Sequence, residues 1–186
     1  RVERHGLPGD YAQALDAAAA SARAGVRMAG PAWYYPGGGW LAPPSWVCHA
    51  LDHPSIRWRG ATAVHALRRG GDSWRLLDAD GRTITCSATV VLANAHDALR
   101  LLGQPPWPLQ RVRGQVTLLG AGLADVPRPA LPLSGDGYAL VLPDGRLLCG
   151  ATRAAGDDAA ALRAADHAYN LQRLQALCGR APALDA

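Results

Sequence analysis

The run Thr89-Val90-Val91-Leu92-Ala93-Asn94-Ala95-His96 combines an apolar stretch with an end made of small residues. β-Branched and aliphatic side chains fill its first half, which predicts a buried strand. Because the Ala93-Asn94-Ala95 end carries little side-chain bulk, the backbone there can approach a ligand closely. A strand that simply runs into a turn explains the same residues equally well.

Other side chains with chemical potential are scattered. His96 taken alone suggests a general base. No combination of Ser, His and Asp, or of Cys and His, stands out as a catalytic constellation. Cys48, His49 and His53 can face a metal if their segment is helical. Third and fourth ligands are not apparent, so we expect no metal site.

Both helices and strands are expected to position these residues. Helices are expected over 10–20, with Gly25 as the stop, and over 43–51, 97–102 and 157–177. Strands are expected within 32–41 and over 56–59, 63–67, 73–78, 83–88, 90–93 and 111–119. A hairpin is expected with strands over 138–142 and 146–149 joined by the turn Pro143-Asp144-Gly145. Residues 105–108 are expected to form an extended connector. The predicted fold class is α+β, mostly antiparallel sheet with flanking helices.

Composition limits the class of protein. The chain has 186 residues, 49% of them apolar, which suffices for a sizeable core. Its net charge of +4 suits a nucleic-acid-facing surface, although solubility explains such a bias too. Four dispersed cysteines without a Cys-x-x-Cys pair indicate reduced thiols in a cytoplasmic protein. No apolar run approaches the roughly 20 residues of a membrane span, so we expect no membrane partner.

Several segments, spread from about residue 7 to residue 177, resemble one protein family. They are Tyr35-Pro36-x-Gly38-Gly39-Trp40-Leu41-x-Pro43, Val90 to His96, Val112-Arg113-Gly114-Gln115, Asp136-Gly137-Tyr138 and Gly150-Ala151-Thr152. Together they resemble the D-amino-acid-oxidase-like flavoproteins, and in particular the FAD-dependent oxidase domain of bifunctional enzymes that modify the wobble uridine of tRNA. No Gly-x-Gly-x-x-Gly dinucleotide fingerprint occurs, so the chain is expected to be an interior fragment that by itself binds FAD weakly or not at all.

The resemblance implies a set of cofactor-binding residues. The backbone of Val64 would hydrogen-bond the FAD adenine, and Ala93, Asn94 and Ala95 would pass close to the cofactor. Ala95 stands where the family usually has glycine. If that glycine has a positive φ, alanine there costs roughly 1 kcal/mol. Without the resemblance, Val64 is most simply an edge-strand core residue.

The resemblance also implies substrate-binding residues. Trp40, Gln115 and Tyr138 would line the substrate cavity, and Tyr138 is the catalytic candidate because it would place the substrate for hydride transfer. From the residues alone, Tyr138 is an ordinary sheet aromatic and Trp40 is either core or pocket wall. Gln115 can merely satisfy backbone groups at a strand end, and Arg113 can belong to a solvated face.

By resemblance, the parent protein is an FAD-dependent oxidoreductase acting on a C–N bond of tRNA. It would remove the carboxymethyl group of 5-carboxymethylaminomethyl-(2-thio)uridine, and a methyltransferase domain elsewhere in the bifunctional protein would then act on the amine. A glycine- or sarcosine-type oxidase and a non-catalytic module of the same fold remain alternatives. Residues 1–103 are interpreted as a partial FAD-binding region with a three-stranded meander, and 104–186 as a partial substrate-binding domain.

Overall fold

The computed structural model describes residues 6–103 and 109–182, so the predicted connector over 105–108 lies outside the described residues. The chain divides into two compact units, each described by itself below. One unit combines Arg1–Leu41 with Val112–Ala186, and the other is Ala42–Arg111. The predicted division between residues 103 and 104 concerns where FAD and substrate bind, and it stays a prediction.

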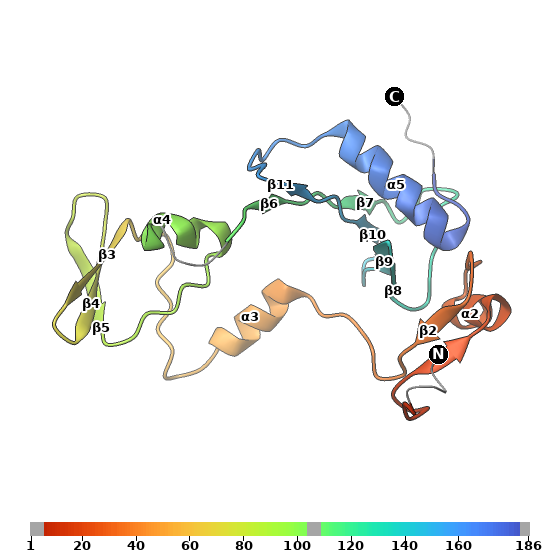
Figure 1. Ribbon diagram of the computed structural model, residues 1–186, viewed down its shortest axis with the longest axis horizontal. Helices are drawn as coiled ribbons and strands as arrows, with labels where there is room; N and C mark the ends of the chain where they lie inside the picture. Colours follow the sequence, from red (N-terminus) through yellow and green to blue (C-terminus); the bar gives the residue numbers. More distant parts are fainter. Residues whose placement is uncertain (1–5, 104–108, 183–186) are drawn as a thin grey trace. The chain divides into compact units, whose positions relative to one another are not determined.

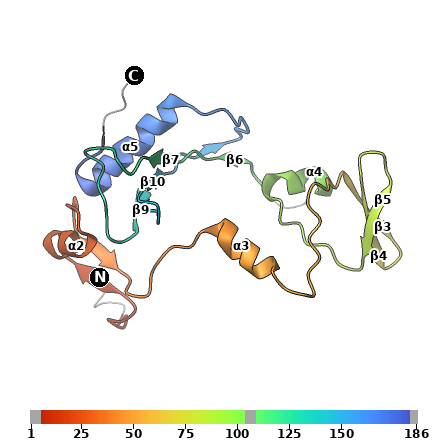
Figure 2. The same cartoon turned by 180° about the vertical axis from the view of Figure 1, so that it is seen from behind.

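The first unit is built on a four-stranded antiparallel sheet in the order β7-β10-β9-β8. Its strands are Thr117–Leu119 (β7), Leu147–Gly150 (β10), Gly137–Val141 (β9) and Leu133–Gly135 (β8). Helix α5, Ala164–Cys178, packs along this sheet (Figures 1 and 2). The core between helix and sheet contains Ala139, Leu147, Cys149, Leu171 and Leu174. The predicted hairpin across Pro143-Asp144-Gly145 is confirmed as β9 and β10.

Three further pieces complete this unit. Strand β1, Gln13–Leu15, pairs with β2, Ala32–Tyr34, and β6, Val112–Arg113, pairs with β11, Ala154–Ala155. Helix α2, Ala17–Ala24, begins later than predicted because Asp16 caps it, accepting a hydrogen bond from the Ala19 amide at 2.8 Å. The helix ends as predicted at Gly25, whose φ of 68° is left-handed.

Two predicted elements of the first unit are wrong in their extent. The strand expected over 111–119 is interrupted between β6 and β7. The helix expected from 157 begins only at Ala164, because the Arg113 guanidinium draws the carbonyls of Ala159 and Ala161 into hydrogen bonds of 2.7 Å each. A contact made across nearly fifty residues of sequence therefore holds this segment out of the helix.

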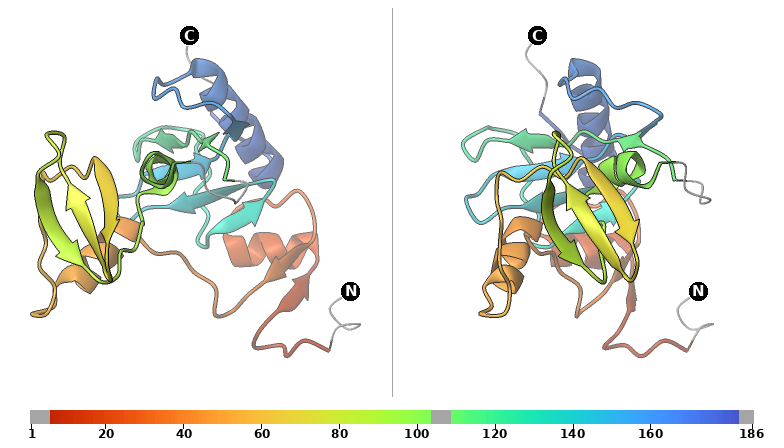
Figure 3. Two further views of the ribbon diagram at one scale, coloured as in Figure 1. Left: turned by 60° about the vertical axis from the view of Figure 1, so that its left-hand side comes forward. Right: turned by 90° about the vertical axis from the view of Figure 1, so that its left-hand side faces the viewer.

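The second unit contains the predicted three-stranded meander, with Ala66–Gly70 (β3), Ser73–Leu77 (β4) and Thr83–Ser87 (β5) in sequential antiparallel order (Figure 3). The predicted helix over 43–51 is confirmed as α3, Pro43–Leu51. The predicted helix over 97–102 is confirmed as α4, Ala98–Leu102, preceded by a 3₁₀ turn η1, Ala95–Asp97. No described helix is long and apolar enough to cross a membrane.

Two predicted strands of the second unit, over 56–59 and 90–93, are wrong. Neither segment pairs with a strand among the described residues, and Val91 is 83% exposed. Extended backbone without a ladder leaves its amides and carbonyls to water, so an apolar pattern alone does not make a strand. The strand expected over 63–67 begins only at Ala66.

Candidate functional site

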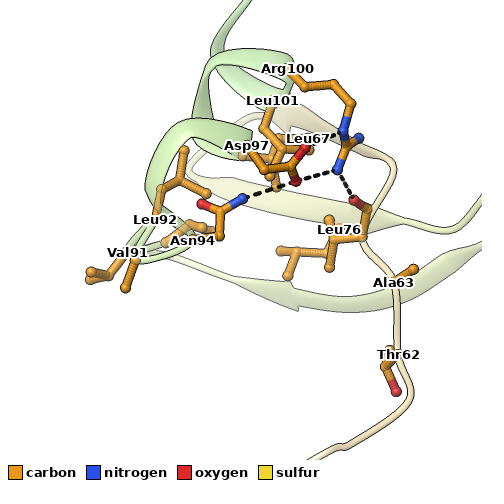
Figure 4. Close-up of a pocket in the computed structure, with 13 residues that line it drawn as sticks. Thr62, Ala63, Leu67, Leu76, Val91, Leu92, Asn94, Asp97, Arg100 and Leu101 are labelled. Atoms are coloured by element: carbon orange, nitrogen blue, oxygen red, sulfur yellow. Dashed lines mark hydrogen bonds and ion pairs between the residues drawn. The ribbon is translucent and has the colours of Figure 1, made fainter. Parts of the chain in front are cut away.

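A cavity of about 420 Å³ lies in the second unit between the meander and the segment that leads into α4 (Figure 4). Three of the four residues expected to contact the cofactor, Val64, Ala93 and Asn94, line it. Its other lining residues are Thr62, Ala63, Leu67, Leu76, Val90, Val91, Leu92, Asp97, Arg100 and Leu101. Ala95 follows directly but is not among them. The fold thus brings together residues about thirty positions apart in sequence.

A polar cluster closes one side of this cavity. Arg100 forms an ion pair with Asp97 at 2.8 Å, and the Asn94 amide donates to the same carboxylate at 3.2 Å (Figure 4). The hydrogen bonds from Arg100 lower the pKa of Asp97 below its ordinary value. Arg100 also donates to the backbone carbonyls of Val64 at 3.1 Å and His65 at 3.0 Å. The guanidinium therefore fastens the α4 segment to the chain just before β3.

The hydrogen bonds from Arg100 determine which backbone groups of Val64 remain available to a ligand. Its carbonyl already accepts one hydrogen bond from Arg100, while its amide has no partner among the described residues. Val64 precedes β3 and is therefore free of the ladder. Arg100 was not singled out from the sequence, although the Asp97-x-x-Arg100 spacing on a predicted helix is the signal of an i,i+3 ion pair.

Ala95 has a backbone φ of 51°, in the left-handed region that disfavours residues with a Cβ atom. Alanine at this position is expected to carry a cost if the backbone φ is positive, and the φ of Ala95 is positive. The strain of roughly 1 kcal/mol is local to the turn between the cavity and α4.

Tyr138 belongs to the first unit and lies on β9, where it pairs with Gly150 of β10 and Ser134 of β8. Its neighbour Ala139 is fully buried in the core with α5, so alternation along the strand sends Tyr138 to the opposite face of the sheet. The side chain is half-buried there, and its hydroxyl has no hydrogen-bond partner among the described residues. A phenol on an open sheet face is available to a ligand.

Gln115 is 4% exposed and its carboxamide is occupied at both ends. The oxygen accepts hydrogen bonds from Arg113 at 2.7 Å and from the Arg163 amide at 3.0 Å, and the nitrogen donates to the Arg163 carbonyl at 2.9 Å. These contacts favour the interpretation that Gln115 satisfies backbone groups. Its role in substrate binding stays a prediction.

Arg113 is not part of a solvated face, and that interpretation is wrong. Its side chain is 9% exposed and forms an ion pair with Asp166 in the first turn of α5. With its bonds to Gln115 and to the carbonyls of Ala159 and Ala161, the guanidinium joins β6, the loop after β11 and α5. No local pattern around Arg113 indicates these contacts, because every partner except Gln115 lies more than forty positions away.

Trp40 is 41% exposed and follows β2 in an irregular segment. A second cavity, of about 620 Å³, lies in the same unit beside β2, β8 and the end of α5, and includes Gly38 and Gly39 in its lining. Trp40 lines neither cavity, so its role in substrate binding stays a prediction. Within residues 6–103 and 109–182, no three His, Cys, Asp or Glu side chains are grouped to hold a metal ion.

Comparisons with known proteins give a consistent picture. The sequence profile of a family described as FAD dependent oxidoreductase matches residues 1–186. The bifunctional protein MnmC of Methylibium petroleiphilum, named for tRNA 5-methylaminomethyl-2-thiouridine biosynthesis, is 42% identical over 91% of the chain and 27% of its own length. The protein of that name from Burkholderia multivorans is 45% identical over 97% of the chain and 28% of its own length.

The chain thus spans about a quarter of the length of these curated relatives. Among solved structures, glycine oxidase from Geobacillus kaustophilus superposes with a TM-score of 0.73 at 21% identity, over 98% of the chain and 51% of the oxidase. Likeness at this level of identity concerns the fold. The predicted α+β class, of the D-amino-acid-oxidase-like type, is confirmed.

Proposed function

The chain belongs to the FAD-dependent oxidoreductase family, and we propose that the whole protein oxidises a C–N bond at the wobble position of tRNA. The substrate is 5-carboxymethylaminomethyl-(2-thio)uridine. Oxidation converts the bond between the amine nitrogen and the carboxymethyl carbon to an imine, and water hydrolyses the imine. The carboxymethyl group leaves as glyoxylate, and 5-aminomethyl-(2-thio)uridine remains in the RNA.

One observation carries this proposal. Identity of 42–45% over more than nine-tenths of the chain relates it to proteins named for biosynthesis of a modified wobble uridine. The similarity to glycine oxidase is 21% and supports the fold alone. The methyltransferase activity of a bifunctional protein would lie outside these residues, and so would the remaining parts of an FAD site.

The residues around the 420 Å³ cavity fit part of FAD. Its walls are apolar and small at Ala63 and Ala93, which suits a flat heteroaromatic ring. The unpartnered Val64 amide supplies a hydrogen-bond donor at its edge. We assign the adenine to this cavity. Bound FAD supplies the two-electron acceptor for the oxidation.

On the substrate side, Tyr138 would orient rather than transfer a proton. Its phenol can donate a hydrogen bond to the substrate carboxylate while its ring excludes water from the reacting carbon. The half-buried position of Tyr138 on the sheet face that also carries Leu118, Leu140 and Leu148 supports this role. No acid or base from the chain is required for hydride to leave a carbon next to a neutral amine.

The test is a comparison of substrates for the whole protein. Undermodified tRNA that carries the carboxymethylaminomethyl group, free glycine and free sarcosine are each incubated with flavin-loaded protein, and glyoxylate is measured. Glyoxylate from the tRNA far above that from the free amines supports the proposal. If glycine or sarcosine yields glyoxylate and the tRNA yields none, the protein is an amino-acid oxidase and the proposed tRNA activity is wrong. A protein that contains no flavin would favour a non-catalytic module.

A further inference from the structure

The face of the four-stranded sheet turned away from α5 is largely apolar, with Ser134 as a polar exception, and has no helix over it in the described chain. Leu118, Leu148 and Leu140 are direct neighbours across β7, β10 and β9, so they form one row on this face. Tyr138 belongs to the adjacent row, opposite Gly150. Leu118 keeps 43% of its surface exposed, although its neighbour Leu119 is buried against the helix.

Arg153 lies between β10 and β11, outside the four-stranded sheet, and the β6–β11 ladder indicates that it too is on the side away from α5. The side chains of Arg113 and Gln115 reach α5 or the loop before it, so Gly114 between them faces the opposite way. Arg113 pairs with Ala154 in the β6–β11 ladder, which sets Arg153 opposite Gly114. Gly114 has no side chain, so the residue opposite Arg153 does not cover the arginine.

Arg153 differs from its neighbouring arginines in having no counter-charge. Arg113, Arg163 and Arg173 each form an ion pair with an aspartate. Arg153 is exposed and makes no ion pair or hydrogen bond with any described residue. The sheet face on this side carries Leu118, Leu140, Leu148, Tyr138 and Ser134, and none of these described residues is a carboxylate. A cation that is unpaired among the described residues, on the same side of the unit as an apolar wall and a phenol, is the arrangement of an anion-binding position.

We propose that Arg153 binds an oxyanion of the substrate on this side of the unit, the side that also presents Tyr138. The inference rests on the proposed function, in which the substrate offers two such groups. One is the carboxylate of the carboxymethylamino arm and the other is a phosphate of the RNA backbone. Arg153 would then be a substrate-binding residue that favours anionic substrates, acting together with the phenol of Tyr138.

The test uses Arg153→Gln and Arg153→Lys in the flavin-loaded whole protein, with Arg146→Gln as the matched control. Arg146 lies in the same unit but pairs with Asp144 in the β9–β10 turn. Two RNAs are the probes: tRNA bearing the carboxymethylaminomethyl group and the same tRNA without it. Dissociation constants, KM, kcat and flavin content are measured, and flavin content shows that the variants remain folded.

We expect Arg153→Gln to raise Kd and KM about tenfold with kcat nearly unchanged, as for one lost hydrogen-bonded charge, and Arg153→Lys to recover part of the loss. A loss confined to the carboxymethylated tRNA identifies the carboxylate. An equal loss for both RNAs, with a salt dependence shallower by about one counterion, identifies a phosphate. Both outcomes support the anion site.

The proposal is overturned if Arg153→Gln binds both RNAs as tightly as Arg146→Gln while retaining its flavin. Failure of the proposed function is a separate result. If the protein oxidises glycine and no tRNA, the KM for glycine becomes the measurement. A raised KM in Arg153→Gln still supports the anion site, and an unchanged KM overturns it.

Discussion

Replacement of Arg113 by glutamine is expected to destabilise α5 and the loop before it by about 3 kcal/mol. Arg113 is 9% exposed and Asp166 is 19% exposed, so the pair is largely removed from water. Removal of one partner from a buried ion pair costs about 3–5 kcal/mol, because the other charge is left uncompensated. We take the lower end because Asp166 keeps partial contact with solvent.

The loss extends beyond Asp166. The carbonyls of Ala159 and Ala161 each lose a donor at 2.7 Å, and both are on an exposed loop where water can replace it. Their contribution is therefore small compared with that of the ion pair. The double variant Arg113→Met with Asp166→Leu removes both charges and should recover much of the stability lost in the single variant.

The suitable assay is native-state hydrogen exchange of the α5 amides in the whole protein, because it reports the opening free energy of this element alone. Arg146→Gln is the control, since Arg146 and Asp144 are 47% and 49% exposed and such pairs contribute less than about 1 kcal/mol. An opening free energy within about 0.5 kcal/mol of the parent for Arg113→Gln would refute the reasoning that this guanidinium holds loop and helix together.

Three further outcomes are expected in the whole protein. Ala95→Gly should raise stability by about 1 kcal/mol in urea denaturation, since φ of 51° costs glycine nothing, and an unchanged or lower midpoint would argue against strain there. Val64→Pro should weaken FAD retention while Val64→Ile should not, because only proline removes the backbone donor; equal flavin in a folded proline variant would separate Val64 from the adenine. Burial, and to a lesser extent the nearby Cys178, raises the pKa of the Cys149 thiol to about 11. The contribution of this thiol to stability is therefore fully present below pH ~8.5, the pKa of a cysteine in the unfolded chain, and it is lost as the pH rises toward 11. Iodoacetamide should accordingly label exposed Cys48 and spare Cys149 until unfolding, and equal labelling rates would contradict the buried placement.

Local signals predicted the elements that depend on neighbouring residues. The turn at Asp80-Gly81, the hairpin across Pro143-Asp144-Gly145 and the left-handed stop at Gly25 all follow from residues within a few positions. The failures depend on distant partners. The segment 13–15 is a strand because it pairs with β2, and 157–163 is not helical because Arg113 binds its carbonyls.

The same distinction holds for the candidate site. Val64, Ala93 and Asn94 were found by their likeness to a family, and the fold places them around one cavity. Arg100 was missed because its function depends on carbonyls 35 and 36 residues earlier in the chain. Such long-range contacts between a side chain and backbone groups leave no pattern in the sequence around either partner.

The most direct test of the proposed activity is reduction of the flavin itself. The whole protein, loaded with FAD, is mixed without oxygen with undermodified tRNA, and the visible absorbance of oxidised flavin is followed in a stopped-flow instrument. The proposed function predicts rapid bleaching by this tRNA but not by glycine. It also predicts bleaching roughly tenfold slower in Tyr138→Phe, as for one lost hydrogen bond to a charged group. Bound flavin that stays oxidised in the presence of saturating tRNA would contradict the proposed function.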